Sequence, residues 1–442
     1  MVLRSLRLRS FRAHAATDVS FAPGVNLLHG PNGAGKTNVL EAIHYLCLTK
    51  SFTATRDRYA IRKEAPYFEL EGTFAGLRRS ETTVRLVYMP GEGKKIFVNG
   101  APLERLAEIV GRLPVVVFSP EDYDLTAGGP KERRRFLNNI LSQAHPAYLD
   151  DTMTYRRARR QRNEVLRQYK SRAQSPPPAV LEPWTEKVVT LGSRVIQRRL
   201  QFLETFRTYL ADAYERIEAV AERPSIAYDG IDDLAPDASV ESIATTFREV
   251  LARRSDAERQ RGTTLAGPQR DELVFCLDDL EVRRYGSQGQ HRTFGMALKL
   301  AQYFYLRDRL DEPPLLLLDD AFGKLDAERT DVFLGLLQSD AIGQSFITAT
   351  RRASFEAAVS FANAANRSLH VTPDAPGVSI EKDVPAPASP QPRAASQPDA
   401  TARDEPVSDK TAADKTAADE AVVDAPSQPA PTASSTASSV DG

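Results

Sequence analysis

The sequence predicts an α/β fold in which two separated parts of the chain form one head, a largely helical arm is inserted between them, and a disordered tail follows. Short strand-like runs separated by turns fill residues 1–125, and such runs return later in PPLLLLDDAF and SFITAT. Residues 131–221 follow an almost wholly helical pattern, interrupted by a proline-rich loop at 175–178. Segments of these two kinds, in this order, indicate an α/β head that carries a helical arm.

The boundaries follow from breaks in composition. A Gly-Gly-Pro sequence interrupts the chain at Pro130, a residue that suits the first position of a helix. The last segment holds eleven of the 29 prolines and repeats KTAAD in tandem, so it buries too little apolar surface to offset its ordering entropy. We therefore expect a first head part at 1–130, an arm at 131–261, a second head part at 262–372 and a disordered tail at 373–442.

Charge and composition exclude several classes of protein. The tail contains 12 acidic and 5 basic residues, so the preceding 372 residues carry a net charge of +6, which permits a polyanionic partner. The cysteines, Cys47 and Cys276, have no metal-ligand spacing and indicate a reducing compartment. No apolar run is long enough for a membrane span or a signal peptide. These features predict a cytoplasmic protein without a membrane partner.

The segment GPNGAGKT fits the phosphate-binding pattern G-x-x-x-x-G-K-[ST] at every fixed position. It follows the strand-like VNLLH and precedes an amphipathic helix predicted from residue 36 to about 48, which is the context that this loop requires. We expect Lys36 to reach the β- and γ-phosphates of a nucleotide and Thr37 to bind Mg²⁺. The predicted nucleotide-binding residues here are Gly30, Pro31, Asn32, Gly33, Ala34, Gly35, Lys36 and Thr37.

A second motif, LLLLDDAFGKLD, places two carboxylates after a buried strand. Ligands of α/β proteins bind at the carboxyl ends of such strands. We expect Asp319 to hold Mg²⁺ and Asp320 to polarise the attacking water. Two solvated aspartates at a strand end are the alternative if the motif is considered alone.

A third motif, YGSQGQHRT, begins a helix with polar residues, and apolar ones start only at Phe294. A serine at the N-cap followed by Gln-Gly-Gln leaves backbone donors and the positive end of the helix dipole available for an anion. A capped helix without a ligand is the alternative. The predicted contacts are Ser287, Gln288, Gly289 and Gln290.

The three motifs together resemble those of ABC-type ATPases, in which the signature helix of one subunit closes over the ATP held by the other. The resemblance implies that Ser287 and Gly289 contact the γ-phosphate across a homodimer and that Ser287 takes part in catalysis with Lys36 and Asp320. Asp326, seven residues after Asp319, matches the D-loop, which also reaches across the dimer.

The distance along the chain between the motifs limits which family of ABC-type ATPases it resembles. Lys36 and Ser287 are 251 residues apart, more than in transporter ATPases, and no long coiled coil with sustained heptads lies between them. The chain is similar to the RecF family of bacterial recombination-mediator ATPases over residues 11–329, and we expect the likeness to cover 1–372. The segments that carry it are FRAH, NGAGKTNVLEAIHYL, VVFSPEDYDLTAGGPKERRRFLN, the QRN of RRQRNEVL, AGPQRDEL, YGSQGQHRTFGMALKLA and LLLLDDAFGKLDAER.

Membership of that family would imply ATP-dependent binding to gapped or duplex DNA in recombinational repair and replication-fork maintenance. ATP and Mg²⁺ would close a homodimer, weak hydrolysis would reopen it, and RecR and indirectly RecA would be partners. Two alternatives stay open: an SMC-like chromosome-structural DNA clamp, and an ATPase subunit of an ABC transporter.

The sequence departs from the ABC pattern in three of its motifs. Gly323 and Lys324 replace the expected Ser-Glu of the D-loop, and no histidine follows SFITAT, where many such ATPases have a γ-phosphate sensor; Thr350 and Arg351 lie there. No glutamine lies at 119–123, where a Q-loop is expected, and Glu121 is a poor substitute. The departures are consistent with slow hydrolysis.

A basic helix predicted at 153–172 has eight basic residues and one acidic residue. Arginines along a helix can neutralise a duplex backbone without reading its sequence, although a solvated arm surface is the simpler alternative. The predicted DNA contacts are Lys131, Arg133, Arg134, Arg156, Arg157 and Arg160, and Arg135 is an equally good candidate.

Overall fold

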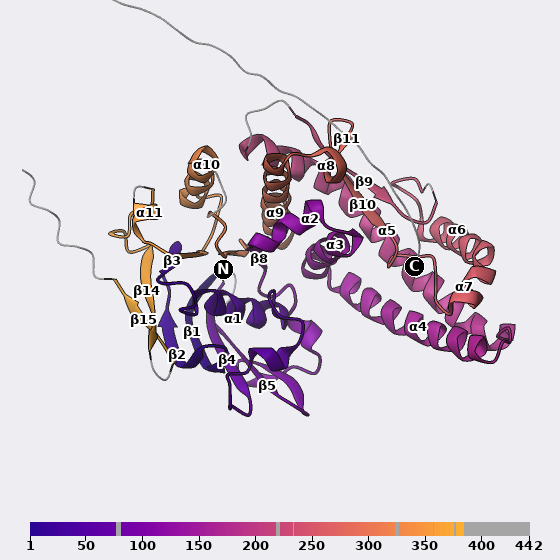
Figure 1. Ribbon diagram of the computed structural model, residues 1–442, viewed down its shortest axis with the longest axis horizontal. Coiled ribbons are helices and arrows are strands. Elements are labelled where there is room, and N and C mark those ends of the chain that lie inside the picture. Colours follow the sequence, from indigo (N-terminus) through magenta and orange to yellow (C-terminus); the bar gives the residue numbers. More distant parts are fainter. Residues whose placement is uncertain are drawn as a thin grey trace, which may run out of the picture. The chain divides into compact units, whose positions relative to one another are not determined.

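The computed structural model describes residues 1–76, 81–217, 222–232, 234–322, 327–356, 358–374 and 377–383 (Figure 1). All described residues belong to one compact unit. Within these ranges no helix is both long and apolar enough to cross a lipid bilayer.

The N-terminal strands form an antiparallel sheet with the order β2-β1-β4-β5-β6-β7. Burial alternates along β4, because one face packs on the core while the other is more open to solvent. The strands are β1 (Val2–Phe11), β2 (His14–Ser20), β4 (Phe68–Ala75), β5 (Thr82–Met89), β6 (Gly93–Val98) and β7 (Ala101–Pro102).

A second sheet combines strands from before and after the helical segment, in the order β15-β14-β3-β13-β12-β8. The five strands from β14 to β8 are parallel, and β15 is antiparallel to β14. The four leucines of β12 are fully buried, as their sequence predicted. The strands are β3 (Val25–His29), β8 (Val115–Phe118), β12 (Leu315–Leu318), β13 (Ser345–Ala349), β14 (Arg367–Asp374) and β15 (Gly377–Lys382).

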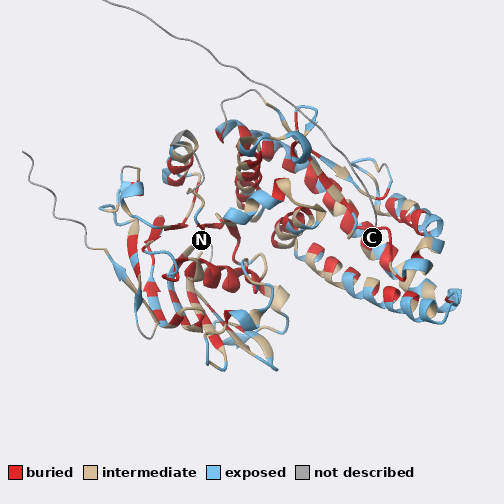
Figure 2. Cartoon of the chain, viewed as in Figure 1, coloured by how far each residue is buried: buried red, intermediate tan, exposed pale blue. Residues whose placement is uncertain are grey.

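Helix α1 (Lys36–Leu48) begins in the glycine-rich loop, and its bounds confirm the prediction. The helix is buried on nearly all sides rather than amphipathic, because it lies between the two sheets: its contacts include β1, β4 and β5 of one sheet and β13 of the other. Figure 2 shows this concentration of buried residues on α1 and the strands around it. Packing on both faces fixes the direction in which its N-terminus points.

The helical arm follows the predicted pattern, and the break between its two longest helices falls at the predicted proline-rich loop. The 40-residue α5 packs along α4, α6 and α9. A three-stranded sheet with the order β11-β10-β9 packs against it. Strands β10 and β11 lie in the predicted second head part, yet β10 pairs with β9 and contacts α3, so this sheet joins residues from both sides of the predicted boundary at 262. The elements are α3 (Pro130–Ala144), α4 (Pro146–Ser171), α5 (Pro178–Ile217), α6 (Val240–Arg253), α7 (Ser255–Arg261), β9 (Pro224–Asp229), β10 (Glu272–Leu277) and β11 (Leu280–Glu281).

Helix α9 (Gln288–Leu310) joins the arm to the parallel sheet, since it contacts α5, α3 and β8. One apolar core therefore runs from α5 through α9 to β12, and the arm is continuous with the head. The remaining elements are η1 (Asp57–Ala60), η2 (Leu106–Ile109), η3 (Pro120–Asp122), α2 (Tyr123–Ala127), α8 (Val282–Tyr285), α10 (Ala327–Gln338) and α11 (Ala353–Glu356).

The fold continues beyond 372, where the tail was predicted to begin. Strand β14 ends at Asp374, and β15 pairs with it in the register Pro373 to Val378. Val378 and Ile380 pack against the core around α1. The prediction placed the boundary about ten residues too early because it followed proline content rather than the alternation of Val378 and Ile380. Residues 384–442 of the predicted tail lie outside the described ranges.

Candidate nucleotide-phosphate site

The loop between β3 and α1 has a backbone that only glycine adopts easily at two positions. Gly30 and Gly35 have φ angles of 147° and 98°, which side-chain-bearing residues rarely adopt. A Cβ on Gly30 would lie 2.1 Å from the carbonyl oxygen of Val371, and one on Gly35 would lie 3.0 Å from Nε2 of His14. Gly30 therefore allows the loop backbone to approach β14, and Gly35 leaves room for the His14 ring of β2.

Lys36 lies inside this loop. Its ammonium donates hydrogen bonds to the carbonyl oxygens of Gly30 and Pro31, both at 2.8 Å. Burial lowers the pKa of Lys36, and the charges of Asp319 and Asp320 oppose that shift. The cation thus lies between the loop and the two carboxylates, where a phosphate chain would meet it.

A hydroxyl–carboxylate network connects the loop to the end of β12. The Thr37 hydroxyl donates to Oδ1 of Asp319 at 2.7 Å, and the Thr348 hydroxyl donates to the same oxygen at 2.9 Å. The backbone N–H of Asp320 donates to the Thr348 hydroxyl at 2.9 Å. Burial raises the pKa of Asp319, and the two hydroxyl donors oppose the shift. Hydroxyls from two segments, the start of α1 and the end of β13, therefore converge on one carboxylate oxygen.

Thr37 and Asp319 fit a magnesium ion. They offer oxygen donors only, which Mg²⁺ prefers, and Mg²⁺ usually takes one or two carboxylates together with waters and substrate phosphates. Among the described residues, no group of three or more His, Cys, Asp or Glu side chains could hold a metal without such additional ligands. Asp320 is exposed beside this pair and has a φ of 47°, an uncommon conformation of the kind found at functional sites.

The third motif begins α9 as predicted, with Ser287 at the N-cap. Its hydroxyl accepts from the N–H of Gln290 at 3.2 Å, and its own N–H donates to Oε1 of Gln290 at 2.7 Å. The Gln290 amide also donates to Glu222 at 2.7 Å. Gln290 therefore has a structural role in the cap, while Ser287 and Gln288 remain exposed to solvent.

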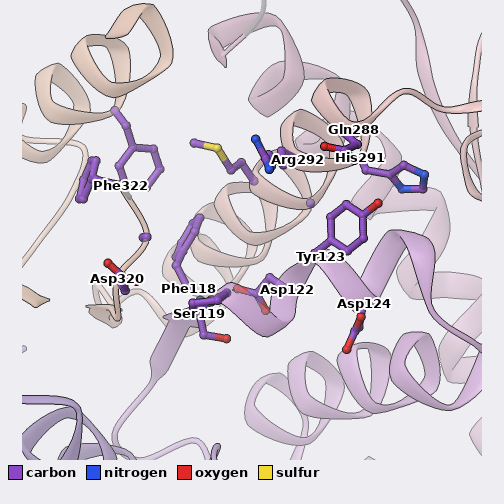
Figure 3. Close-up of a pocket in the computed structure, with 15 residues that line it drawn as sticks. Phe118, Ser119, Asp122, Tyr123, Asp124, Gln288, His291, Arg292, Asp320 and Phe322 are labelled. Carbon is purple, nitrogen blue, oxygen red and sulfur yellow. Dashed lines mark hydrogen bonds between the residues drawn. The ribbon is translucent and has the colours of Figure 1, made fainter. Parts of the chain in front are cut away.

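A cavity of about 380 Å³ brings the second and third motifs together (Figure 3). Gln288 and Arg292 of α9 line it on one side and Asp320 on another. Phe118 and Phe322 contribute apolar walls, and each packs against Phe333 with ring centroids 5.2 and 5.8 Å apart. The end of β12 and the start of the signature helix thus share one pocket, which sequence reasoning did not find.

Two histidines that support the phosphate loop were not predicted from the sequence. Buried His14 lies with Nδ1 2.9 Å from the Thr17 hydroxyl and Nε2 3.1 Å from the Gly35 carbonyl. His29, which precedes Gly30, lies 2.6 Å from Asp383 through Nε2 and stacks on His370. His14 belongs to the FRAH segment, so a sequence signal for it existed.

The departures from the ABC pattern have partial structural explanations. Glu121 is exposed, whereas Asp122 forms the ion pair of this loop, with Lys299 at 2.8 Å. Thr348, inside SFITAT, contacts Asp319, but nothing in the structure assigns a sensor role to the exposed Thr350. Gly323, Lys324 and the predicted D-loop residue Asp326 lie outside the described residues.

The predicted DNA contacts separate into two groups. The prediction that Arg133 contacts DNA is wrong. Its guanidinium is buried and bonded to Glu272 at 2.7 and 3.1 Å, so it holds α3 to β10 and cannot reach a polyanion. Arg134 is half-buried and donates to the Asp271 carbonyl at 2.7 Å. The exposed candidates are Lys131, Arg156, Arg157 and Arg160.

Taken together, the parallel sheet, the phosphate loop and the carboxylates after β12 define an SMC/ABC-like P-loop ATPase fold. A family model described as "RecF/RecN/SMC N terminal domain" matches residues 2–372. The chain is 68% identical over 383 residues to the "DNA replication and repair protein RecF" of Salinibacter ruber, covering 87% of this chain and 93% of that protein. The protein of the same name from Chloroherpeton thalassium is 44% identical over 358 residues, covering 80% and 96%. This chain belongs to the RecF family.

Two solved structures have a fold similar to that of this chain. One titled "Structure of the recombination mediator protein RecF-ATPrS in RecFOR pathway" has a TM-score of 0.78 at 28% identity, covering 86% of this chain and 97% of that one. A second, titled as the RecF-ATP form, has a TM-score of 0.79 at 27% identity, covering 87% and 98%. The fold and family expected from the sequence are thereby confirmed.

Proposed function

We propose that this protein is an ATP-dependent DNA-binding protein of recombinational repair and replication-fork maintenance. The observation that carries the proposal is the convergence of Thr37 and Thr348 on one oxygen of Asp319. That network connects a phosphate loop to the carboxylates after β12, the arrangement that phosphoryl transfer needs. The names and ATP-containing titles of the relatives support the same activity.

Each residue of the site has a distinct role in this proposal. Lys36 neutralises charge on the β- and γ-phosphates, and the N–H groups of the loop and of the α1 N-terminus bind their oxygens. Thr37 and Asp319 hold Mg²⁺, which when bound neutralises phosphate charge. Exposed Asp320 polarises the attacking water. Hydrolysis is weak, because the SFITAT strand is not followed by a histidine sensor.

The γ-phosphate is contacted in trans by the start of α9 in a second copy of the chain. Ser287 and Gly289 lie at an exposed or half-exposed helix start, where an anion of a partner subunit has access. ATP would thereby close a homodimer on gapped or duplex DNA, and hydrolysis would reopen it. RecR would be a protein partner, and RecA would be loaded downstream.

The test measures binding to a fluorescently labelled gapped duplex, with and without ATP and Mg²⁺. Wild-type protein should bind DNA more tightly with ATP than without it. Lys36→Ala should lose that difference, because no cation then neutralises the charge on the β- and γ-phosphates of ATP. Lys63→Ala is the matched control, since Lys63 is an exposed lysine in the same part of the chain. DNA affinity that does not respond to ATP, or responds equally in Lys36→Ala, would contradict the proposal.

A further inference from the structure

Another cavity, of about 370 Å³, lies between α5 and α9, two helices that pack along each other. Buried Phe202 and Tyr305 line its inner part, and exposed Thr205 and Arg309 line its outer part. His145, the residue before α4, also lines it, and its Nε2 lies 3.3 Å from the Tyr305 hydroxyl. The cavity shares no lining residue with the one beside the nucleotide-phosphate site, so the two are separate.

Two arginines of this cavity have no partner. Arg198 is half-buried and Arg309 is exposed, and neither side chain forms a hydrogen bond or ion pair with another described residue. Burial, and then the charges of Arg309 and Arg198, lower the pKa of His145 to about 4, so both cations lie close to that ring. Asp151, a carboxylate near Arg198, is already paired with Arg194 at 3.8 Å. A cation that has lost part of its hydration is normally paired, so the counter-charge is expected from outside the chain.

The carboxylate that lines the cavity does not supply this counter-charge. Asp308 accepts from the Tyr209 hydroxyl at 3.0 Å and from Nε of Arg307 at 2.8 Å, so each of its oxygens has a donor. Arg307 offsets the charge of Asp308, and the two unpaired arginines give the cavity a net positive charge. Its electrostatics therefore fit an anionic group.

The aromatic rings of the cavity pack on one another edge to face. The ring centroids of Phe202 and Tyr305 are 4.9 Å apart at an interplanar angle of 89°, and those of Tyr209 and Tyr305 are 5.7 Å apart at 87°. Nucleobases bind aromatic side chains by stacking on a ring face. Because these three rings do not present parallel faces around a slot, the cavity fits a compact apolar side chain better than a base.

We propose that this cavity is a docking site for an acidic segment of a protein partner. Carboxylates of that segment pair with Arg198 and Arg309, because a planar guanidinium group can bind a carboxylate at two points. An adjoining aromatic or aliphatic side chain packs against Phe202 and Tyr305. The partner thereby contacts α9, the helix that begins at Gln288, about 26 Å away along its axis at 1.5 Å per residue.

The probe is a fluorescein-labelled hexapeptide of four glutamates followed by two phenylalanines, and fluorescence anisotropy measures its binding to the full-length protein. Wild-type protein should bind it saturably. Replacement of both phenylalanines by serine should weaken binding by about tenfold or more, since the apolar contact is lost. ATP should not displace the peptide, because the cavity is separate from the nucleotide-phosphate site.

Three variants test the cavity itself. Arg198→Glu and Arg309→Glu reverse its charges, and Thr205→Trp fills it while leaving the charges in place; each should weaken peptide binding by about tenfold or more. Arg172→Glu is the matched control, because Arg172 is an exposed arginine without a side-chain partner at the opposite end of α4 from His145. It should retain wild-type affinity. Unfolding temperatures equal to that of wild type would show that a loss of binding does not come from misfolding.

Several results would overturn the proposal: no saturable binding by wild-type protein, an equal loss in Arg172→Glu, or equal binding of the serine peptide. A single-stranded oligothymidylate that displaces the peptide and loses its own binding in Thr205→Trp would show that the cavity takes nucleic acid instead. These failures would leave the proposed function intact, since ATP-dependent binding to gapped DNA is measured without the peptide.

Discussion

Nε2 of His14 lies 3.1 Å from the carbonyl oxygen of Gly35, the last glycine before Lys36. Burial lowers the pKa of His14, so the ring is neutral at physiological pH. A carbonyl can only accept, so Nε2 carries the proton and donates to Gly35, while Nδ1 accepts from the Thr17 hydroxyl at 2.9 Å. The first β-hairpin thereby orients the end of the phosphate loop.

Replacement of His14 by Ala should weaken ATP binding by roughly tenfold. The buried Gly35 carbonyl would lose its donor, and an unsatisfied group of this kind costs about 1–3 kcal/mol. His14→Gln should recover part of the affinity, because its side-chain amide can donate to the same oxygen. The measurement is titration with a fluorescent ATP analogue. Equal loss in both variants, together with reduced thermal stability in both, would indicate a packing role only.

Acid should destabilise the protein partly through His44. Burial lowers the pKa of this residue to about 4, below its unfolded value of about 6.5. The unfolded state therefore binds more protons between these values, so stability is retained above pH 6.5 and decreases as the pH falls towards 4. Between pH 7 and 4.5 the loss from this residue is about 2–3 kcal/mol at most. Urea unfolding of wild type and His44→Gln over this range should show a shallower decline in the variant, and parallel curves would contradict the assignment.

Sequence patterns predicted the elements whose signals are local. The bounds of α1 and the N-cap at Ser287 follow from residues within one turn of the helix start. Arg133 was misassigned although its position carried a signal: Phe136, Leu137 and Ile140 follow at helical spacing, so Arg133 lies on the apolar face of α3. Charge content was given more weight than periodicity.

Other parts of the site depend on contacts that no local pattern contains. Thr348 reaches Asp319 from a neighbouring strand, and Val371 closes on Gly30 from a strand more than 300 residues away in the sequence. The strand order of the parallel sheet decides both contacts, and strand order is a property of the whole fold. The cavity between Asp320 and Gln288 has the same origin.

Substitution of the two carboxylates after β12 should affect two different steps, ATP binding and ATP hydrolysis. Asp319→Asn should weaken Mg²⁺-dependent ATP binding, because Thr37 and Thr348 would face a neutral amide in place of the carboxylate. Asp320→Asn should bind ATP normally and hydrolyse it at least tenfold more slowly, since its exposed carboxylate contributes little to the fold. Light scattering with ATP and a phosphate-release assay test both variants. If Asp320→Asn stays monomeric under conditions where wild type dimerises, the two roles are wrongly divided.

The end of the folded part should lie after Asp383. Truncation after 383 should leave thermal stability and ATP binding unchanged, because β15 and the contact between Asp383 and His29 remain. Truncation after 372 should lower both, since it removes Val378 from beside Gly35 as well as β15. For a folded part of this length, each kcal/mol lost should lower the unfolding temperature by about 1 °C. Two truncations with identical unfolding temperatures would show that β15 adds no stability.

Ser287→Arg tests whether the start of α9 acts on a second subunit. The Ser287 hydroxyl caps its own helix, so the variant should lose about 1 kcal/mol of stability and still fold. Binding of one ATP to the monomer should be preserved, because the phosphate loop is unchanged. ATP-driven dimerisation, measured by light scattering, should be abolished by the bulky cation in the shared interface, and ATP-dependent DNA binding should fall with it.

Ser287→Ala is the control: it removes the cap without adding bulk, so it should dimerise far better than the arginine variant. A mixture of Ser287→Arg with Lys36→Ala can assemble at most one intact composite site per heterodimer, which should recover part of the dimer signal. Loss of ATP binding by the Ser287→Arg monomer would show instead that the helix start acts within its own chain.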